Sequence, residues 1–181
     1  MAAQRIPLSV GKKARGIKLL LLDLDGVLTD GGIVMDDRGK EIKRFDVRDG
    51  HGVRLLQRAG IQVGIISGRS SNAARYRAKD LGIELLYQGM DDKLVAYEKI
   101  KRITRLKDGE IAYVGDDLVD LPLLRRVGLA IAVNDCWKDL KRHTDYVTRA
   151  SGGRGAVREV AELLLLAQRK WHSVTRKYYL S

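Results

Sequence analysis

The sequence predicts a three-layer α/β domain built on a central parallel β-sheet, and two observations carry this prediction. Six short apolar runs recur along the chain, at residues 17–22, 61–66, 84–87, 111–114, 129–133 and 146–148, and amphipathic segments separate them. Near-continuous apolar strands that alternate with helical patterns are typical of parallel sheets covered by helices on both faces. We expect residues 1–181 to form one domain, because a chain of this length builds a single core.

Helix start and stop signals fall between these runs. Ser70 or Ser71 is placed to cap the N-terminus of a helix that Gly82 ends. A further helix is predicted to close at Gly128, in the sequence RRVG. These signals support helical crossovers between the strands.

One segment departs from the alternation of strands and helices. Residues 31–45, GGIVMDDRGKEIKRF, have the pattern of two strands around the turn DDRG. They directly follow two aspartates, Asp23 and Asp25, at the end of the first apolar run. We therefore expect a β-hairpin flap above this strand end.

Both ends of the chain are basic. Residues 1–16 form a basic N-terminal segment, and residues 152–181 contain a glycine-rich stretch, a helical pattern and a basic, aromatic tail. The glycines at 152–155 are expected to act as a hinge. The tail is too polar to finish a core, so it is expected to be disordered, to lie on a partner subunit or to reach an active site.

The net charge of +11 predicts an anionic partner, which can be nucleic acid, anionic lipid or an anionic metabolite. Aromatic residues make up only 6% of the chain and no nucleic-acid-binding module is visible, which argues against nucleic acid. No signal peptide or stretch of roughly 18 apolar residues is present. The single cysteine, Cys136, is expected to be inert and favours a reducing compartment, so we expect a cytoplasmic protein.

Polar residues that can perform chemistry follow four of the apolar runs. In an open parallel sheet the ligand crevice lies outside the carboxyl ends of the strands, so such residues meet there. Asp23 and Asp25 point to the same side, because side chains of an extended chain alternate with a period of two. The other candidates are Ser67 after 61–66, Lys93 after 84–87, and Asp116, Asp117 and Asp120 after 111–114.

This crevice collects several carboxylates around one lysine and one hydroxyl group. Carboxylates this close repel one another or become protonated, whereas a hard divalent cation neutralises them. Mg²⁺ is the usual cation where a phosphate completes the coordination shell. The pattern therefore predicts a Mg²⁺ site and a phosphate-bearing substrate.

The residue types favour a division of labour in phosphoryl transfer. Asp23 would attack phosphorus, and Asp25 would protonate the leaving alkoxide and later activate water. Ser67 and Lys93 would hold the phosphoryl oxygens. Each residue alone has an ordinary structural explanation as a turn, a helix cap or an exposed charge. Four such features in order, each after an apolar run, favour a catalytic site.

The chain resembles the haloacid dehalogenase superfamily in four motifs, DLDGVLT, SGR, Lys93 and GDDLVD, which occur in the right order across about residues 17–133. The resemblance implies a Rossmann-like domain and a Mg²⁺ ion held by Asp23, the Asp25 backbone carbonyl and Asp116, with an aspartyl-phosphate on Asp23. It also implies that Asp117 and Asp120 are supporting residues near the metal ion. A proton donor at Asp25 favours phosphatase over dehalogenase, because a departing halide needs no proton.

No long insertion besides the hairpin 31–45 separates these motifs, so no cap domain is expected. Two segments, DGVLTDGGIVMDDRGKEIKRFDVRDGHGVRLL and GGRGAVREVAELLLLAQ, resemble the 3-deoxy-D-manno-octulosonate 8-phosphate phosphatase family. This resemblance implies release of phosphate from that eight-carbon sugar acid in lipopolysaccharide precursor synthesis. It also implies a homotetramer in which neighbouring flaps cover the site and the C-terminal segment of one chain closes over another chain's site as a lid.

The substrate of that family carries a phosphate at one end and a carboxylate at the other, and arginine binds both groups bidentately. Each arginine alone is also explained as a solvated surface charge. His51 is expected to be a hydrogen-bonding residue rather than a metal ligand or base. Arg154 is expected from a neighbouring subunit, and the full expected substrate-binding set is Asp25, Asp46, Arg48, Asp49, Gly50, Arg54, Arg69, Arg77, Lys93 and Arg154.

Two alternative functions remain at this point. A phosphatase of a related nine-carbon, sialic-type acid phosphate would use the same capless scaffold, although VRDG and GGRGAVREV favour the eight-carbon acid. A non-catalytic basic protein that binds nucleic acid or a membrane surface is supported by the tail QRKWHSVTRKYYLS. Because every proposed catalytic position is filled, we expect an enzyme that binds a phosphorylated sugar acid and neither nucleic acid nor membrane.

Overall fold

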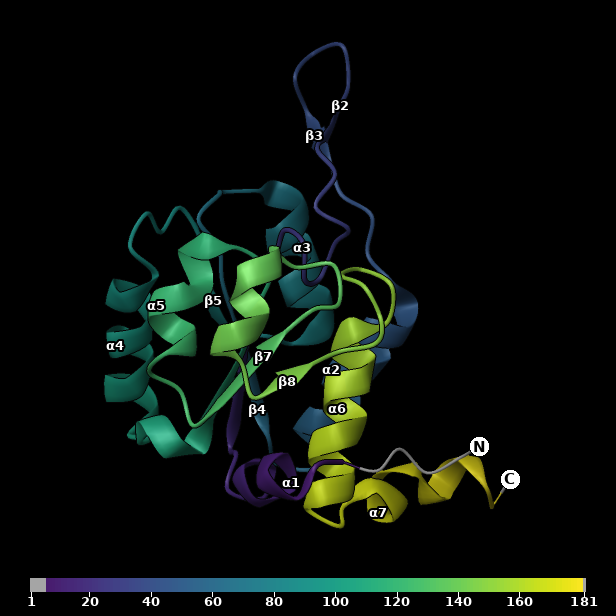
Figure 1. The fold of residues 1–181 in the computed structure, drawn as a ribbon. Helices are drawn as coiled ribbons and strands as arrows, with labels where there is room; N and C mark the ends of the chain where they lie inside the picture. Colours follow the sequence, from purple (N-terminus) through teal and green to yellow (C-terminus); the bar gives the residue numbers. More distant parts are fainter. Residues whose placement is uncertain (1–5, 181) are drawn as a thin grey trace.

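The computed structural model describes residues 6–180, and its centre is a six-stranded parallel sheet with the strand order β5-β4-β1-β6-β7-β8 (Figure 1). The central strand β1 consists of four fully buried leucines paired in parallel with β4 and β6. All six predicted strands are present: β1 (Leu19–Leu22), β4 (Gln62–Ile66), β5 (Leu85–Tyr87), β6 (Ile111–Gly115), β7 (Leu129–Ala132) and β8 (Tyr146–Val147).

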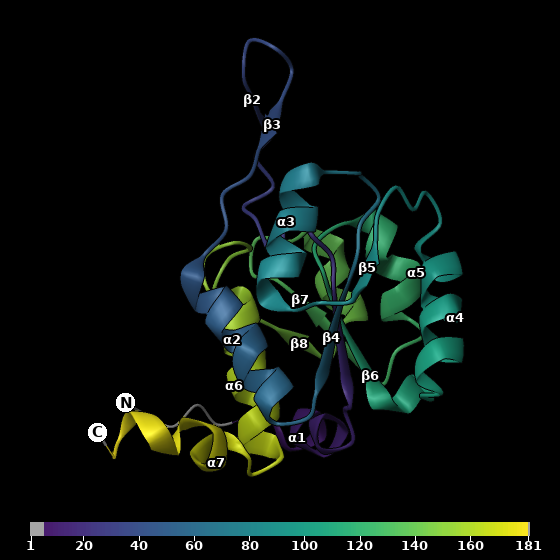
Figure 2. The same cartoon turned by 180° about the vertical axis from the view of Figure 1, so that it is seen from behind.

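Helices cover both faces of this sheet, which confirms the predicted three layers (Figures 1 and 2). On one face α2 packs along α6, with α1 and α3 beside them, and α4 and α5 lie on the other face. Burial of the apolar helix faces stabilises a layered domain of this kind. The helices are α1 (Leu8–Arg15), α2 (Val47–Arg58), α3 (Asn72–Leu81), α4 (Lys93–Thr104), α5 (Leu121–Leu124), α6 (Ala156–Ala167) and α7 (Trp171–Thr175). Short 3₁₀ helices lie at Asp108–Glu110, Leu118–Asp120, Lys138–His143 and Arg176–Tyr178.

The predicted boundaries of α3 are confirmed. The Ser71 side chain caps the helix by accepting the backbone N–H of Ala74, and Gly82 ends it in the left-handed conformation with φ 65°. Cys136, which the sequence analysis expected to be inert, is a free and buried thiol.

The predicted helix end at Gly128 is wrong. Helix α5 ends at Leu124, with Arg125 as its C-cap residue. The Gly128 N–H donates instead to the carbonyl oxygens of Asp108 and Ile111, at 2.7 and 3.0 Å. A Cβ atom on Gly128 would lie 2.6 Å from the Gly109 Cα, so a glycine is needed here for the close approach of two loops and not for a helix end.

The predicted flap is an antiparallel hairpin that projects beyond the carboxyl ends of the parallel strands (Figure 1). Its two strands are β2 (Val34–Met35) and β3 (Glu41–Ile42). The Asp36 carboxylate shapes the turn by accepting the N–H groups of Arg38 and Lys40. Within residues 6–180 no separate cap domain accompanies the flap, as expected.

The expected glycine hinge at residues 152–155 is not a hinge within this chain. The Gly153 N–H donates to the Val27 carbonyl at 2.9 Å, and the Gly152 N–H donates to Asp135 Oδ1 at 2.9 Å. A Cβ atom on Gly152 would lie only 1.7 Å from the Gly26 carbonyl oxygen. The glycines therefore let this segment pack directly on the backbone that follows β1.

The two end segments lie at the end of the molecule opposite the flap (Figures 1 and 2). In the N-terminal basic segment 1–16, of which residues 6–16 are described, α1 buries Val10 and Ala14. The C-terminal tail forms α7 and a 3₁₀ turn, and α7 contacts α2 and α6. The tail thus does not reach the active site of its own chain. Within residues 6–180 no helix is long and apolar enough to cross a membrane.

Candidate active site

The predicted catalytic residues line one depression at the carboxyl end of the parallel sheet. Its volume is about 410 Å³. Strands β1, β4 and β6 run in the same direction, so the loops that follow them converge at this edge. The depression is lined by Asp23, Asp25, Ser67, Lys93, Asp116 and Asp117, together with Arg69, Asp91, Gly68, Met90 and Val119.

Lys93 joins two of the carboxylates from the first turn of α4. Asp92 caps the helix by accepting the N–H of Leu94, and Lys93 follows as the first helical residue. Its Nζ lies 2.5 Å from Asp23 Oδ1 and 2.6 Å from Asp120 Oδ1. Burial alone would lower the pKa of Lys93, but the two carboxylates raise the pKa above its usual range. Lys93 is therefore a buried cation in the wall of the site.

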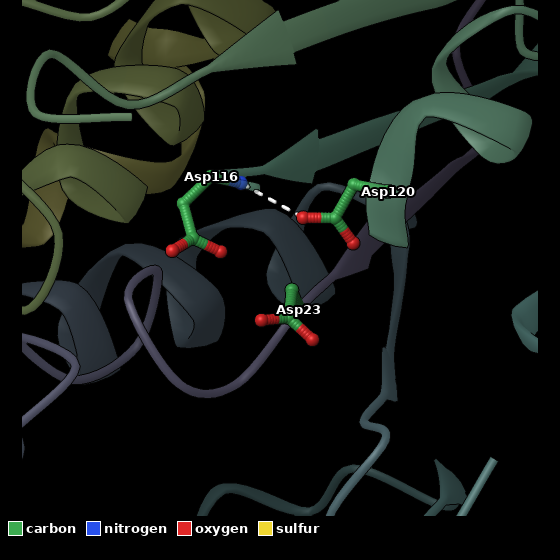
Figure 3. Close-up of side chains that lie close together, drawn as sticks. All are labelled: Asp23, Asp116 and Asp120. Atoms are coloured by element: carbon green, nitrogen blue, oxygen red, sulfur yellow. Dashed lines mark hydrogen bonds between the residues drawn. The ribbon is translucent and has the colours of Figure 1, made fainter. Parts of the chain in front are cut away.

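Asp120 is completely buried and accepts four hydrogen bonds. Its Oδ1 accepts from Lys93 Nζ and from the Tyr113 hydroxyl, both at 2.6 Å. Its Oδ2 accepts the backbone N–H of Asp116 at 2.8 Å (Figure 3). The same oxygen accepts the backbone N–H of Asp117 at 3.2 Å. These bonds occupy both oxygens, so Asp120 orients the loop that carries Asp116 rather than offering itself to a metal ion.

Three carboxylates, those of Asp23, Asp116 and Asp120, offer oxygen atoms within 4.8 Å of one another (Figure 3). Burial, followed by the charge of Asp120, raises the pKa of Asp23 to about 7 against the opposing effect of Lys93. Burial, followed by the charge of Asp23, raises the pKa of Asp116 to about 8. One lysine does not neutralise three carboxylates, and an all-oxygen donor set suits Mg²⁺. Asp23 and Asp116 are the side chains that would hold the ion.

Gly26 allows Asp116 to approach the loop after β1. Asp23 is fixed at the strand end, where its N–H donates to the Val114 carbonyl at 3.0 Å. Gly26 has φ +90°, and a Cβ atom there would lie 2.1 Å from Asp116 Oδ2. Any side chain at this position would displace Asp116. The glycine that directly follows the two aspartates is thus required by the geometry of the site.

Asp25 faces the flap. Lys43 follows β3, its side chain is 2% exposed, and its Nζ donates to Asp25 Oδ1. The same Nζ lies 3.1 Å from Glu41 Oε1, which also accepts from Arg69 Nη2 at 2.8 Å. The other oxygen, Asp25 Oδ2, is buried and accepts no hydrogen bond within residues 6–180. Arg69 Nε lies 3.9 Å from this second oxygen. Asp25 therefore has one oxygen held by Lys43 and one oxygen without a hydrogen-bond donor, which is the position that a proton donor would use.

Lys43 and Glu41 were not predicted as site residues. The sequence does contain a signal for them, because the two-residue period of a strand places Glu41 and Lys43 on the same side of the flap. Ile42 between them is on the other side and is 54% exposed. The sequence did not show whether this charged side of the flap faces the active site or the solvent, so the two residues were not predicted.

The loop after β4 supplies a hydroxyl group and a guanidinium group. The Ser67 N–H donates to the Tyr87 carbonyl at 2.9 Å, and its Oγ donates to the Arg69 carbonyl at 3.0 Å. Ser67 is 1% exposed and is held at the wall of the depression. Of the five arginines predicted to bind substrate, Arg69 alone lines this depression.

Two of the other predicted arginines, Arg48 and Arg154, line a second depression of about 510 Å³ beside the base of the flap. Arg48 pairs with Asp46 at 2.9 Å, and Asp46 also caps α2 by accepting the Arg48 N–H. Arg154 Nη2 lies 3.6 Å from Asp30. The structure therefore places these predicted substrate-binding residues together, but not around the carboxylate cluster of the same chain.

Two further predicted substrate-binding residues make contacts within the fold. Asp49 is buried and accepts the N–H groups of Gly155 at 3.1 Å and Arg158 at 2.8 Å, so it caps α6. Arg54 donates to the carbonyl of Asp80 near the end of α3. These contacts engage Asp49 and Arg54 inside their own chain, away from the depression.

Arg77 and Gly50 lie where α2 meets α3. Arg77 Nη1 is 2.7 Å from Asp80 Oδ2, and its guanidinium carbon lies 5.7 Å from the centre of the Phe45 ring. A Cβ atom on Gly50 would lie 2.3 Å from Arg77 Nη2, so Gly50 makes room for the guanidinium group. Neither residue lines the depression of its own chain.

His51 forms hydrogen bonds through both ring nitrogens, as expected. Its Nε2 lies 3.0 Å from the Tyr178 hydroxyl, and its Nδ1 lies 3.1 Å from Arg158 Nη1. It connects α2 to the C-terminal tail and does not line the carboxylate depression.

The raised carboxyl pKa values predict how stability depends on pH and Mg²⁺. Because the pKa values of Asp23 and Asp116 in the folded chain lie above the ordinary aspartate value of 3.8, the unfolded chain binds fewer protons than the folded chain between about pH 4 and pH 8. Without metal, the free energy of unfolding is therefore expected to fall as pH rises through this window. Mg²⁺ is expected to reverse the loss by pairing with the ionised carboxylates. Thermal unfolding with chelator and with Mg²⁺, at several pH values, measures both effects.

The variant Asp116→Asn tests the assignment. It removes one buried charge, so its melting temperature with chelator at pH 8 is expected to exceed that of the native chain by roughly 2–4 °C, equivalent to about 1 kcal/mol. It is also expected to lose the stabilisation by Mg²⁺. The matched control Asp37→Asn changes an exposed flap carboxylate and should leave both results unchanged. An unchanged response of Asp116→Asn to Mg²⁺ would contradict the assignment.

Comparisons with known proteins agree with this site. The family model of the haloacid dehalogenase-like hydrolases matches residues 47–128. The 3-deoxy-D-manno-octulosonate 8-phosphate phosphatase KdsC of Yersinia pestis is 48% identical over 164 residues, which cover 91% of this chain and 88% of the relative. The KdsC of Escherichia coli K12 is 50% identical over 158 residues, which cover 87% of this chain and 84% of the relative.

Solved structures are similar along nearly the whole chain. The crystal structure of the Yersinia pestis phosphatase has a TM-score of 0.90 and covers 91% of this chain and 89% of its own. The Moraxella catarrhalis 3-deoxy-D-manno-octulosonate 8-phosphate phosphatase, solved with magnesium ion, phosphate ion and KDO, has a TM-score of 0.91 at 41% identity and covers 93% and 97% of the two chains. The chain therefore belongs to the 3-deoxy-D-manno-octulosonate 8-phosphate phosphatase family of haloacid dehalogenase-like hydrolases.

Proposed function

We propose that this chain is a Mg²⁺-dependent phosphatase that releases phosphate from 3-deoxy-D-manno-octulosonate 8-phosphate. One observation carries the proposal: a single depression is lined by the Asp23 and Asp116 carboxylates, by Lys93 and by Asp25, whose Oδ2 accepts no hydrogen bond within the described residues. The relatives at about 50% identity and the Moraxella catarrhalis complex with KDO support the substrate. They favour the eight-carbon acid over the nine-carbon acid, and catalysis over a purely binding role.

The residues support a two-step phosphoryl transfer. An Asp23 carboxylate oxygen attacks phosphorus, the bond from phosphorus to the sugar oxygen breaks, and Asp25 gives its proton to the departing alkoxide. Asp25 then takes a proton from a water molecule that attacks the phosphorus of the aspartyl-phosphate, which releases phosphate and restores Asp23. Lys93 and Ser67 bind the phosphoryl oxygens. Bound Mg²⁺, held by Asp23, Asp116 and the Asp25 backbone carbonyl, would neutralise the negative charge of the phosphoryl group.

Phosphate release from the eight-carbon substrate, with Mg²⁺ and with chelator, tests this function. The native chain is expected to show chelator-sensitive release, and Asp23→Asn should lower kcat by at least about 10³-fold because no nucleophile remains. Asp37→Asn serves as the control, and circular dichroism verifies that each variant is folded. If the native chain released phosphate equally well from the nine-carbon acid phosphate, the substrate assignment would be overturned. A folded native chain with no release from either substrate would overturn the function.

Lys43 is expected to position the acid-base residue. Lys43→Met removes the group that holds Asp25 Oδ1, so kcat should fall about 10²-fold while the KM for substrate changes little. Lys43→Arg keeps a donor and should recover part of the loss. Lys40→Met, on the exposed outer part of the same flap, is the matched control. Equal effects of Lys43→Met and Lys40→Met on kcat would contradict the positioning role.

We propose further that the chain is a cytoplasmic homotetramer in which neighbouring flaps meet. Free Cys136 agrees with a reducing compartment. The flap leaves four apolar side chains more than half exposed, and an apolar surface of this kind favours burial against another chain. The arginines of the second depression remain candidates for binding a neighbour's substrate. The four exposed apolar residues are Ile33, Val34, Met35 and Ile42.

Sedimentation of a flap variant tests the assembly. Val34→Glu combined with Met35→Glu places charges on the apolar strand β2 and is expected to give monomers, whereas Arg38→Glu at the hairpin turn should leave the tetramer intact. A native chain that sediments as a monomer, or a double variant that stays tetrameric, would contradict this assembly. Any lid formed by the basic tail must cover a neighbour's site, since the tail lies far from the site of its own chain (Figure 1).

A further inference from the structure

Four charged side chains meet where the flap reaches the active site. The flap supplies Glu41, in β3, and Lys43, which directly follows β3. The loops after β1 and β4 supply Asp25 and Arg69. Two cations thus face two carboxylates. The proposed mechanism gives proton transfer to Asp25 and its positioning to Lys43, but it gives no role to Glu41, whose side chain is only 15% exposed.

Glu41 joins the two cations through a single oxygen atom. Its Oε1 accepts from Lys43 Nζ at 3.1 Å and from Arg69 Nη2 at 2.8 Å. Burial would raise the pKa of Glu41, but hydrogen bonds from Ser71 and from the two cations lower the pKa below its usual value, so Glu41 is ionised at neutral pH. Hydrogen bonds between charged partners are stronger than those between neutral groups. Glu41 therefore fixes the position of both cations.

The guanidinium group of Arg69 lies between Glu41 and Asp25. Its Nη2 is bound to Glu41, whereas its Nε lies 3.9 Å from Asp25 Oδ2, beyond hydrogen-bond distance. A shift of about 1 Å toward Asp25 would bring Nε within that distance. Since Lys43 already holds Asp25 Oδ1, the shift would leave neither oxygen of Asp25 free.

We propose that Glu41 is a positioning residue that keeps Arg69 away from Asp25 Oδ2 and so leaves this oxygen free to reach the departing sugar oxygen. The inference rests on the proposed role of Asp25 as proton donor. Without the charge of Glu41, Asp25 would be the only carboxylate left among these four residues. Opposite charges attract more strongly as they approach, so Arg69 would close on Asp25.

A purely structural role of Glu41 makes a different prediction. If the contact of Glu41 with Arg69 only tied the flap to the body of the domain, losing either partner would release the flap and lower kcat in the same way. If Glu41 instead keeps Arg69 away from Asp25, removing Arg69 should cure the loss that a Glu41 variant causes. The double variant therefore separates the two roles.

Phosphate release from the eight-carbon substrate is measured for the native chain, for both single variants and for the double variant. Glu41→Gln should lower kcat about tenfold. Arg69→Met should raise KM, because it removes a cation that lines the site, and keep kcat within about threefold of the native value. The double variant should recover kcat to within about threefold of native, because no guanidinium group remains to close on Asp25. Glu41→Asp keeps the charge and should recover part of the loss.

A second substrate tests whether the loss concerns proton donation. Nitrophenolate departs without a proton, so Glu41→Gln should keep kcat/KM for p-nitrophenyl phosphate within about threefold of native. The control Asp37→Asn removes one negative charge from the exposed part of the same flap and should match the native chain with both substrates. Circular dichroism verifies that every variant is folded.

The outcomes distinguish this inference from the proposed function. A double variant with kcat as low as that of Glu41→Gln would overturn the role of Glu41 alone, as would an unchanged kcat in Glu41→Gln or an equal loss with p-nitrophenyl phosphate. A folded native chain that releases no phosphate from the sugar acid would overturn the proposed function, and the role of Glu41 with it.

Discussion

The active site depends on one buried ion cluster, in which Lys93 lies between Asp23 and Asp120. Removing charged groups from water is costly, and a buried charge is tolerated only when partners satisfy it. Asp120 meets this demand with four donors, two of which are the backbone N–H groups of Asp116 and Asp117. The cluster therefore fixes both Asp23, the proposed nucleophile, and the loop that carries Asp116, the proposed second metal ligand. The cluster leaves an excess of negative charge on Asp23 and Asp116. A divalent cation would neutralise this charge.

The backbone around this cluster is packed as closely as the side chains. Gly26 admits Asp116, and Gly152 packs on the carbonyl of Gly26. The segment before α6 thus supports the loop after β1 from the outside, while Asp49 in α2 caps the start of α6. Gly152, expected to be part of a hinge, and Asp49, expected to bind substrate, instead fix the segment that supports this loop. On the flap side of the site, Lys43, Glu41 and Arg69 are the charged residues that meet around Asp25.

The sequence was sufficient to predict the strands and the residues at their ends. It was insufficient to predict contacts between segments that are far apart in the chain. Strands such as β1 and β6 were predictable because their apolar runs are continuous, and Asp23, Ser67, Lys93 and Asp116 were predictable because the ends of parallel strands converge. The contact of Lys43 with Asp25 was not, because it depends on how the flap turns back. Gly152 was wrongly predicted to be part of a hinge. Glycine occurs both in flexible segments and where two backbones pack closely, and the sequence alone does not distinguish the two cases.

The assignment of roles among the three carboxylates is the central claim of this account. A crystal structure of the chain with Mg²⁺ and beryllium fluoride, which mimics a phosphoryl group on a carboxylate, tests it most directly. We predict beryllium bonded to an Asp23 oxygen, Mg²⁺ held by Asp23 and Asp116, and Asp120 still bound to Lys93 and Tyr113. Mg²⁺ coordinated by Asp120, or beryllium fluoride bound away from Asp23, would contradict the account.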